Sequence, residues 1–133
     1  MKLTILDANA ANPGDLSWDI FKDLADVCLF ERTNQEDVIN RVGNSDAIFV
    51  NKVSITEEIL TKLPDLKYIG VCATGYNVID IEACKKRGIV VTNIPSYSTE
   101  AVAQHVFALI THFSNNVALH NCSVQNGDWI NSP

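Results

Sequence analysis

A chain of 133 residues is the size of one ordinary domain and is long enough to bury a hydrophobic core. Hydrophobic residues make up 47% of the chain and charged residues 20%, which excludes the polar, highly charged composition of disordered proteins. The net charge of −6 disfavours nucleic acid and anionic membranes as partners, because both attract basic surfaces.

Short β-branched or apolar runs recur at fairly even spacing, and each predicts a buried strand. They are Leu3–Leu6, Val27–Phe30, Ala47–Val50, Tyr68–Val71 and Ile89–Thr92. Segments of helical character lie between them, over Trp18–Leu24, Asn34–Val42, Thr56–Leu63 and Asp80–Arg87. Strands that alternate with helices over short loops predict a parallel sheet covered on both faces. The sequence therefore predicts an α/β fold with a flavodoxin-like, five-stranded parallel sheet.

Two of these helices carry capping signals. Ser54 stands three residues before Glu57, which is the spacing of a capping box, in which both side chains accept free backbone N–H groups at the start of a helix. Asp80 is predicted to cap the next helix, and Gly88 to end it with a left-handed residue.

An unusually long helix is predicted over Thr99–Asn121, with Ser98 as its cap and apolar residues in two stripes. Such a helix must be buried on more than one side, so we expect it to pack against something outside this chain or against a second copy. The remaining residues, 125–133, are rich in turn formers. We therefore divide the chain into a sheet domain, residues 1–97, and a second part, residues 98–133.

The cysteines and histidines give no sign of a metal site. Cys28, Cys72, Cys84 and Cys122 form no C-x-x-C pair, and we interpret them as small buried hydrophobic residues in a reducing compartment. His105, His112 and His120 lack the i, i+4 spacing of a metal-binding pair. The N-terminal apolar run is too short for a signal peptide and no stretch approaches a membrane span, so we expect a cytoplasmic protein.

Ligands of doubly wound sheets bind outside the carboxyl ends of the strands, which directs attention to the loops there. The loop after the fourth predicted strand ends in Thr74-Gly75, where small residues let consecutive backbone N–H groups approach an anion such as a carboxylate. Gly75 could equally supply only a permissive turn. Lys52, after the third strand, either adds a positive charge to the same cleft or is simply solvated.

Nucleotide and nucleophile motifs are absent from the sequence. It contains neither G-x-G-x-x-G nor G-x-x-x-x-G-K-[ST], so no phosphate-binding loop of a nucleotide is predicted in these residues. No serine lies in a G-x-S-x-G turn, and no cysteine has an obvious histidine partner. We therefore assign no catalytic residue.

The second half of the chain resembles a known family. The stretch Val71–Asp80 reads V-C-A-T-G-Y-N-V-I-D and is followed by Ala83, Gly88, Ile89, Val91, Asn93 and Pro95. These residues, together with Ser98–Leu109 and Gly127–Trp129, resemble the D-isomer-specific 2-hydroxyacid dehydrogenases, nearest to their glycerate dehydrogenase and hydroxypyruvate reductase branch. The first half of the chain matches mainly in the order of its elements.

This resemblance implies that residues 1–97 form the substrate domain and that the long helix, Thr99–Asn121, leads into a Rossmann domain missing here and joins a homodimer. The backbone of Thr74 and Gly75 would bind the carboxylate of a small 2-keto or 2-hydroxy acid, with Asn51 or Lys52 bordering it. Thr74 and Val102 would lie near the nicotinamide of NAD, or of NADP. The family's catalytic arginine, glutamate and histidine and its dinucleotide loop would lie beyond Pro133, so the isolated chain is predicted to be inactive.

Two other classes compete with this interpretation. A non-enzymatic, dehydrogenase-derived dimerisation or corepressor-type module would keep the same fold and bind a ligand or partner. A phosphoacceptor receiver would need an acidic pair after the first strand, an Asp after the third and a Lys after the fifth. The corresponding loops offer Asp7 alone, then Asn51-Lys52, then residues 93–98, so the receiver is set aside.

Overall fold

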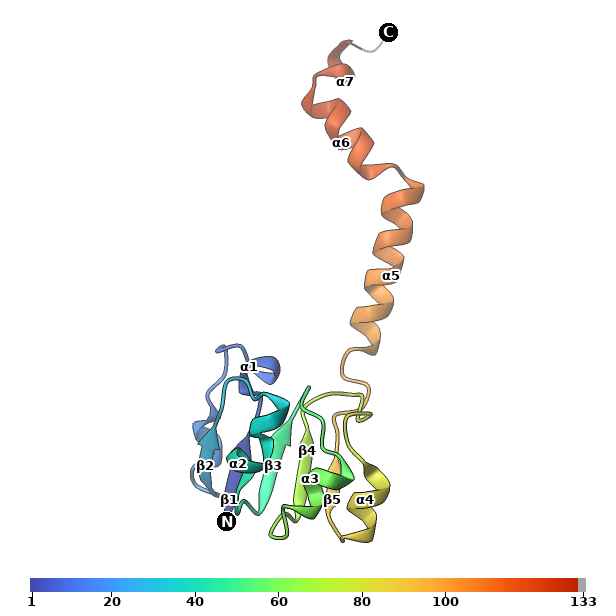
Figure 1. The fold of residues 1–133 in the computed structure, drawn as a ribbon. Coiled ribbons are helices and arrows are strands. Elements are labelled where there is room, and N and C mark those ends of the chain that lie inside the picture. The colour runs from blue at the N-terminus through green and yellow to red at the C-terminus, as the bar shows by residue number, and fades with distance from the viewer. Residues whose placement is uncertain (132–133) are drawn as a thin grey trace. The chain divides into compact units, whose positions relative to one another are not determined.

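The computed structural model describes residues 1–131, and the chain divides into two compact units between Pro95 and Ser96. We call residues 1–95 the sheet unit and the described residues from Ser96 onward the helical unit (Figure 1). The predicted division after residue 97 lies close to this one. The assignment of the two parts to a substrate domain and to the start of an NAD-binding domain stays a prediction.

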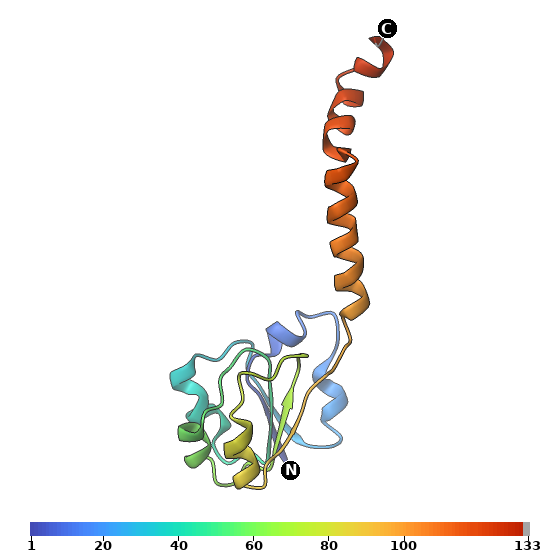
Figure 2. The ribbon, with the colours of Figure 1, turned by 90° about the vertical axis from the view of Figure 1, so that its right-hand side faces the viewer.

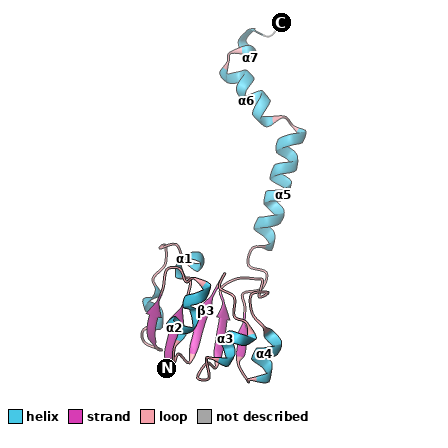
Figure 3. Ribbon diagram, viewed as in Figure 1, coloured by secondary structure: helices cyan, strands magenta, loops and turns pink. Residues whose placement is uncertain are grey.

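The sheet unit is built on five parallel strands in the order β2-β1-β3-β4-β5 (Figure 3). The strands are β1 Lys2–Ile5, β2 Asp26–Leu29, β3 Ala47–Val50, β4 Tyr68–Val71 and β5 Val90–Thr92. This is the flavodoxin-like order, in which the chain reverses its direction of winding between β1 and β3. The predicted fold class and the five strands are confirmed.

Helices cover the sheet on both faces (Figure 2). They are α1 Ala8–Ala11, the 3-10 turns η1 Trp18–Phe21 and η2 Gln35–Asp37, α2 Val38–Val42, α3 Glu57–Thr61 and α4 Ile81–Lys86. The larger core lies between the sheet and α2, α3 and α4, and a smaller one around Leu3 and Ile5 packs against Trp18 and Phe21. The predicted helix over Trp18–Leu24 is wrong, because the exposed Ile20 and Leu24 provide no buried face that would extend the η1 turn.

One predicted cap is confirmed and one is wrong. The Asp80 side chain accepts a backbone N–H in the first turn of α4, and Gly88 follows that helix with a φ of 69°. Ser54 does not cap α3, because its peptide groups bind the Gln35 side chain, with Gln35 Nε2 2.8 Å from the Ser54 carbonyl oxygen. Thr56 takes the N-cap position, and its hydroxyl accepts the N–H of the third helical residue.

The edge strands and two cysteines are more exposed than predicted. Most side chains of β2 and β5 are exposed, since each of these strands lies at an edge of the sheet. Cys28 on β2 and Cys122 in the helical unit are exposed, and Cys72 is half-buried. Among the four cysteines, Cys84 alone fits the prediction of a buried hydrophobic residue, with 1% of its surface accessible.

The helical unit corrects the prediction of one continuous helix. It contains α5 Thr99–Ser114, α6 Val117–Gln125 and α7 Asp128–Asn131. The helix ends before Asn121 because Asn116 adopts a left-handed conformation, with a φ of 48°. Asparagine tolerates this conformation, and the neighbouring Asn115 side chain binds the Thr111 carbonyl oxygen at 3.0 Å in competition with the helix backbone.

The ends of the helical unit differ from prediction as well. Ser98 occupies the N-cap position of α5, but its side chain makes no capping hydrogen bond. α7 forms within the tail predicted to consist of turns, whose last two residues, Ser132 and Pro133, lie outside the described residues. Within residues 1–131, no helix combines the length and the apolar character needed to cross a bilayer.

Candidate functional site

The carboxyl ends of β1, β3, β4 and β5 meet at one edge of the sheet, because all the strands are parallel (Figure 1). The turns after these strands carry every candidate residue of the sheet unit. Asp7 follows β1, Asn51-Lys52 follows β3 and Thr74-Gly75 stands in the loop after β4. The predicted substrate residues therefore gather at one edge and not at opposite ends of the unit.

The turn after β3 is held by a buried carboxylate. Asp7 is 6% exposed, and its Oδ1 and Oδ2 accept the backbone N–H of Asn51 at 2.8 and 3.0 Å. Asp7 Oδ2 also accepts the backbone N–H of Lys52. The Asn51 side chain donates from Nδ2 to the Ala10 carbonyl oxygen at 2.9 Å, while its buried Oδ1 has no hydrogen-bond partner among the described residues. The sequence analysis did not predict this role of Asp7. The one signal for it in the sequence is that an acidic residue directly follows β1, where the chain reverses its direction of winding.

A cavity of about 400 Å³ opens beside this turn, between the carboxyl ends of β1, β2 and β3. The residues that line it include Arg32 and Lys52, both exposed to solvent. The other lining residues are mostly polar: Asp7, Asn9, Ala10, Thr33, Asn34, Gln35 and Val53. With two cationic groups and several amides, the cavity is suited to a small polar or anionic group. Arg32 was not singled out from the sequence.

The turn after β4 is held to the loop after β5. Thr74 Oγ1 donates to the Ile94 carbonyl oxygen at 3.1 Å, and Asn93 Nδ2 donates to the Thr74 carbonyl oxygen at 2.8 Å. Both Thr74 and Gly75 are exposed. The φ of Gly75 lies outside the left-handed region, so the turn does not need glycine for its conformation, but a Cβ there would stand 3.3 Å from Asn77 Oδ1. The small size of Gly75 keeps the backbone open to a ligand.

Cys72 connects the two turns. Its backbone N–H donates to the Val50 carbonyl oxygen at 2.7 Å, so the ends of β3 and β4 stay in register. Burial raises the pKa of the Cys72 thiol, and the negative charge of Asp7 raises this pKa further. The electrostatic effect of Asp7 thus extends to the end of β4. The cavity wall, however, includes Lys52 but neither Thr74 nor Gly75.

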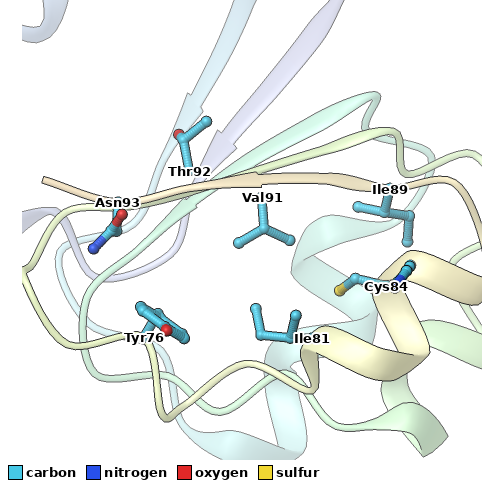
Figure 4. Close-up of a pocket in the computed structure, with 8 residues that line it drawn as sticks. Tyr76, Ile81, Cys84, Ile89, Val91, Thr92 and Asn93 are labelled. Carbon is cyan, nitrogen blue, oxygen red and sulfur yellow. The ribbon is translucent and has the colours of Figure 1, made fainter.

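A second pocket, of about 390 Å³, lies between α4 and β5 (Figure 4). Ile81, Cys84, Ile89 and Val91 give it an apolar wall, and Tyr76 and Asn93 lie toward its other end. The sequence analysis missed it, because these residues read as ordinary core positions. The remaining lining residues are Lys85 and Thr92, so the pocket is mainly apolar and has one cationic residue.

Comparison with known proteins places this geometry in a family. Residues 8–130 match the model of the D-isomer specific 2-hydroxyacid dehydrogenase catalytic domain. The chain belongs to this dehydrogenase family. The resemblance stated from the sequence is thereby confirmed.

Relatives of the chain include a hydroxypyruvate reductase from Blautia hydrogenotrophica, with 39% identity over 136 aligned positions that cover 100% of the chain. A glycerate dehydrogenase from Methylorubrum extorquens is 37% identical over 94 residues, or 71% of the chain. The chain spans 42% and 30% of the lengths of these two relatives.

Solved dehydrogenase-like structures share the fold. The acyclic imino acid reductase Bsp5, in complex with NADPH and D-Arg, matches 96% of the chain with a TM-score of 0.77 and 36% identity. The D-lactate dehydrogenase of Aquifex aeolicus, complexed with NAD and lactic acid, matches 95% with a TM-score of 0.72 and 30% identity. These matches cover 41% and 37% of the solved chains.

The nicotinamide cofactor of the dehydrogenase family does not fit these residues alone. The sequence has no glycine-rich dinucleotide loop, and the side chains assigned to the cofactor lie in different units. Thr74 is in the sheet unit, whereas Val102 is in the helical unit and is 59% exposed. Residues 1–131 also contain no group of three histidine, cysteine, aspartate or glutamate side chains placed to hold a metal ion.

Proposed function

We propose that this chain is the substrate-binding, N-terminal part of an NAD- or NADP-dependent oxidoreductase that interconverts a small D-2-hydroxy acid and its 2-keto acid. Glycerate and hydroxypyruvate are the pair that the names of the relatives favour. The observation that carries the proposal is the exposed Thr74-Gly75 turn, which stands at the carboxyl edge of the sheet one strand away from the Asn51-Lys52 turn.

In this proposal each turn has its own task. Backbone N–H groups around Thr74 and Gly75 bind the substrate carboxylate, since small residues leave them accessible. Asn51 and Lys52 border the distal end of the substrate through the cavity beside them. Thr74 and Val102 lie near the nicotinamide, while the catalytic groups and most of the cofactor site belong to residues outside this chain.

The proposal extends to assembly and location. The exposed apolar residues of α5, which include Phe107 and Phe113, support a homodimer formed through the helical unit. We further propose that the protein works in the cytoplasm.

The test uses the complete reading frame that contains this chain. We expect the complete protein to oxidise NADH or NADPH with hydroxypyruvate, while residues 1–133 alone show no turnover. Lys52→Met should raise KM for hydroxypyruvate about tenfold, because it removes a charge from the substrate cavity. Lys62→Met is the matched control, since Lys62 lies on the surface and pairs with Glu58. No reduction of any small 2-keto acid by the complete protein would overturn the proposal.

A non-enzymatic module is the second candidate. The exposed apolar residues of α5 favour it, because they fit an association surface whether or not catalysis occurs. A complete protein that dimerises and binds a 2-keto acid without reducing it would support the module over the enzyme.

A further inference from the structure

We propose that Asp7 is a positioning residue of the keto-acid site, whose carboxylate fixes the Asn51-Lys52 turn and so holds Lys52 at the wall of the substrate cavity. The inference rests on the proposed function, because it assigns a task within the site that this function requires. It adds a residue that follows β1 and contributes to the site through another residue.

Several hydrogen-bond donors converge on the carboxylate of Asp7. Two consecutive backbone N–H groups, of Asn51 and Lys52, point to the oxygens of Asp7. A carboxylate that is 6% exposed would be costly without such donors, and hydrogen bonds to a charged acceptor are stronger than neutral ones. The contact joins the ends of β1 and β3, the two strands between which ligands of this fold class bind.

The Asn51-Lys52 turn contains a buried acceptor that makes no hydrogen bond to the described residues. Asn51 Oδ1 is buried without a partner in the described part of the chain, although its amide nitrogen binds the Ala10 carbonyl oxygen. A buried acceptor without a donor destabilises the fold, so other contacts must hold the turn in this conformation. The hydrogen bonds to Asp7 are such contacts, together with the bond from Asn51 Nδ2 to Ala10.

The side chain of Lys52 is not paired with an acidic side chain of the described residues. It is exposed, lines the cavity, and forms no ion pair with Asp7 or with another acid among residues 1–131. Asp7 therefore holds the backbone of Lys52 without neutralising its ammonium group. Lys52 and Arg32 remain available as the two cationic groups of the cavity wall.

A first experiment uses the chain itself. Amide hydrogen exchange followed by NMR should show Asn51 and Lys52 protected at least about tenfold more than the Thr74 and Gly75 amides, which donate to no carboxylate in this structure. Asp7→Asn should reduce this protection, because a neutral amide offers one acceptor oxygen in place of two charged ones. Equal exchange in the two turns of the unmodified chain overturns the proposal even if the variant fails to fold.

Asp46→Asn is the matched control. Asp46 also accepts a backbone N–H, from Lys2 at 2.9 Å, but it precedes β3 and so lies at the opposite edge of the sheet. This variant should leave the exchange of Asn51 and Lys52 unchanged. Asp7→Asn should also speed alkylation of Cys72 about twofold, because loss of the nearby charge lowers the pKa of that thiol, whereas Asp46→Asn should not.

A second experiment uses the complete protein. Asp7→Asn should raise KM for hydroxypyruvate about tenfold and change kcat less than about twofold. In a Lys52→Met background the same change should have no further effect on KM, since Asp7 acts through Lys52. Additive effects, or an unchanged KM in Asp7→Asn, overturn the positioning role, whereas an unmodified protein without any reductase activity overturns the proposed function instead.

Discussion

The sheet unit and the helical unit contain similar kinds of apolar side chains, but many of these are buried in the sheet unit and exposed in the helical unit. All the fully buried hydrophobic residues described lie between Leu3 and Ile89. In α5, by contrast, no residue is buried, and Phe107 and Phe113 are 68% and 75% exposed. The difference shows that apolar content alone does not make a core, because a core also needs a second layer to pack against.

Geometry explains why the two units differ. A parallel sheet presents two faces, and α2, α3 and α4 return along one of them, so every inward side chain meets a neighbour from another element. The helices of the helical unit follow one another along the chain, and two of them are separated by the left-handed Asn116. Their apolar faces therefore require a surface that residues 96–131 do not supply.

The largest expected contrast comes from the same substitution in the two units. Ile69→Ala should lower the free energy of unfolding of the sheet unit by about 2–5 kcal/mol, since Ile69 is fully buried and the change leaves a cavity. Ile110→Ala, at a residue 55% exposed on α5, should change it by less than about 0.5 kcal/mol. Urea unfolding followed by circular dichroism measures both, and equal losses would contradict the division into two units.

Thiol reactivity gives a second contrast. Cys122 is exposed on α6, whereas Cys84 is buried in the core, where burial and the charge of Asp80 raise the pKa of its thiol. Alkylation of Cys122 should be about a hundredfold faster at pH 8, since Cys84 reacts only through opening of the sheet unit. Mass spectrometry of peptides after timed labelling measures the two rates. Comparable rates would mean that the core opens readily.

The smallest expected effect concerns charge. The pKa of Asp46 is lowered by its hydrogen bond to the Lys67 ammonium and by the backbone N–H of Lys2, so its charged form stabilises the sheet unit. This contribution is present above the usual aspartate pKa and is lost as pH falls through the lowered value. Asp46→Asn should therefore reduce Tm slightly at pH 7 and not at pH 2. Asp128→Asn, in the helical unit, should leave Tm unchanged at both, and Tm measured by calorimetry tests the pair.

Much of the sheet unit could be predicted because its signals are local. The runs Ala47–Val50 and Tyr68–Val71 are strands with the predicted bounds, and Asp80 caps its helix as its position suggests. Ser54 misled the prediction because its peptide groups bind Gln35, nineteen residues away in the chain. A capping signal depends only on residues that are close in the sequence, so it does not show a competing hydrogen-bond partner that is distant in the sequence.

The residues of the candidate site also differ in whether the sequence alone could identify them. Thr74 and Lys52 were identified from strand ends, since parallel strands bring those ends together. Arg32 was not identified, and the loop at Asp7 was selected without its role as an anchor, because that role depends on which strand lies beside β3. That neighbour is β1, which is paired with it across more than forty residues of sequence.

The sequence by itself determined the strands, their parallel arrangement and the family, because hydrophobic periodicity and short motifs are written in consecutive residues. Tertiary structure alone decided that Asp7 anchors the Asn51-Lys52 turn and that Arg32 and Lys52 share one cavity. Contacts of this kind depend on strand order and on the burial of individual atoms, which arise only when distant segments pack together.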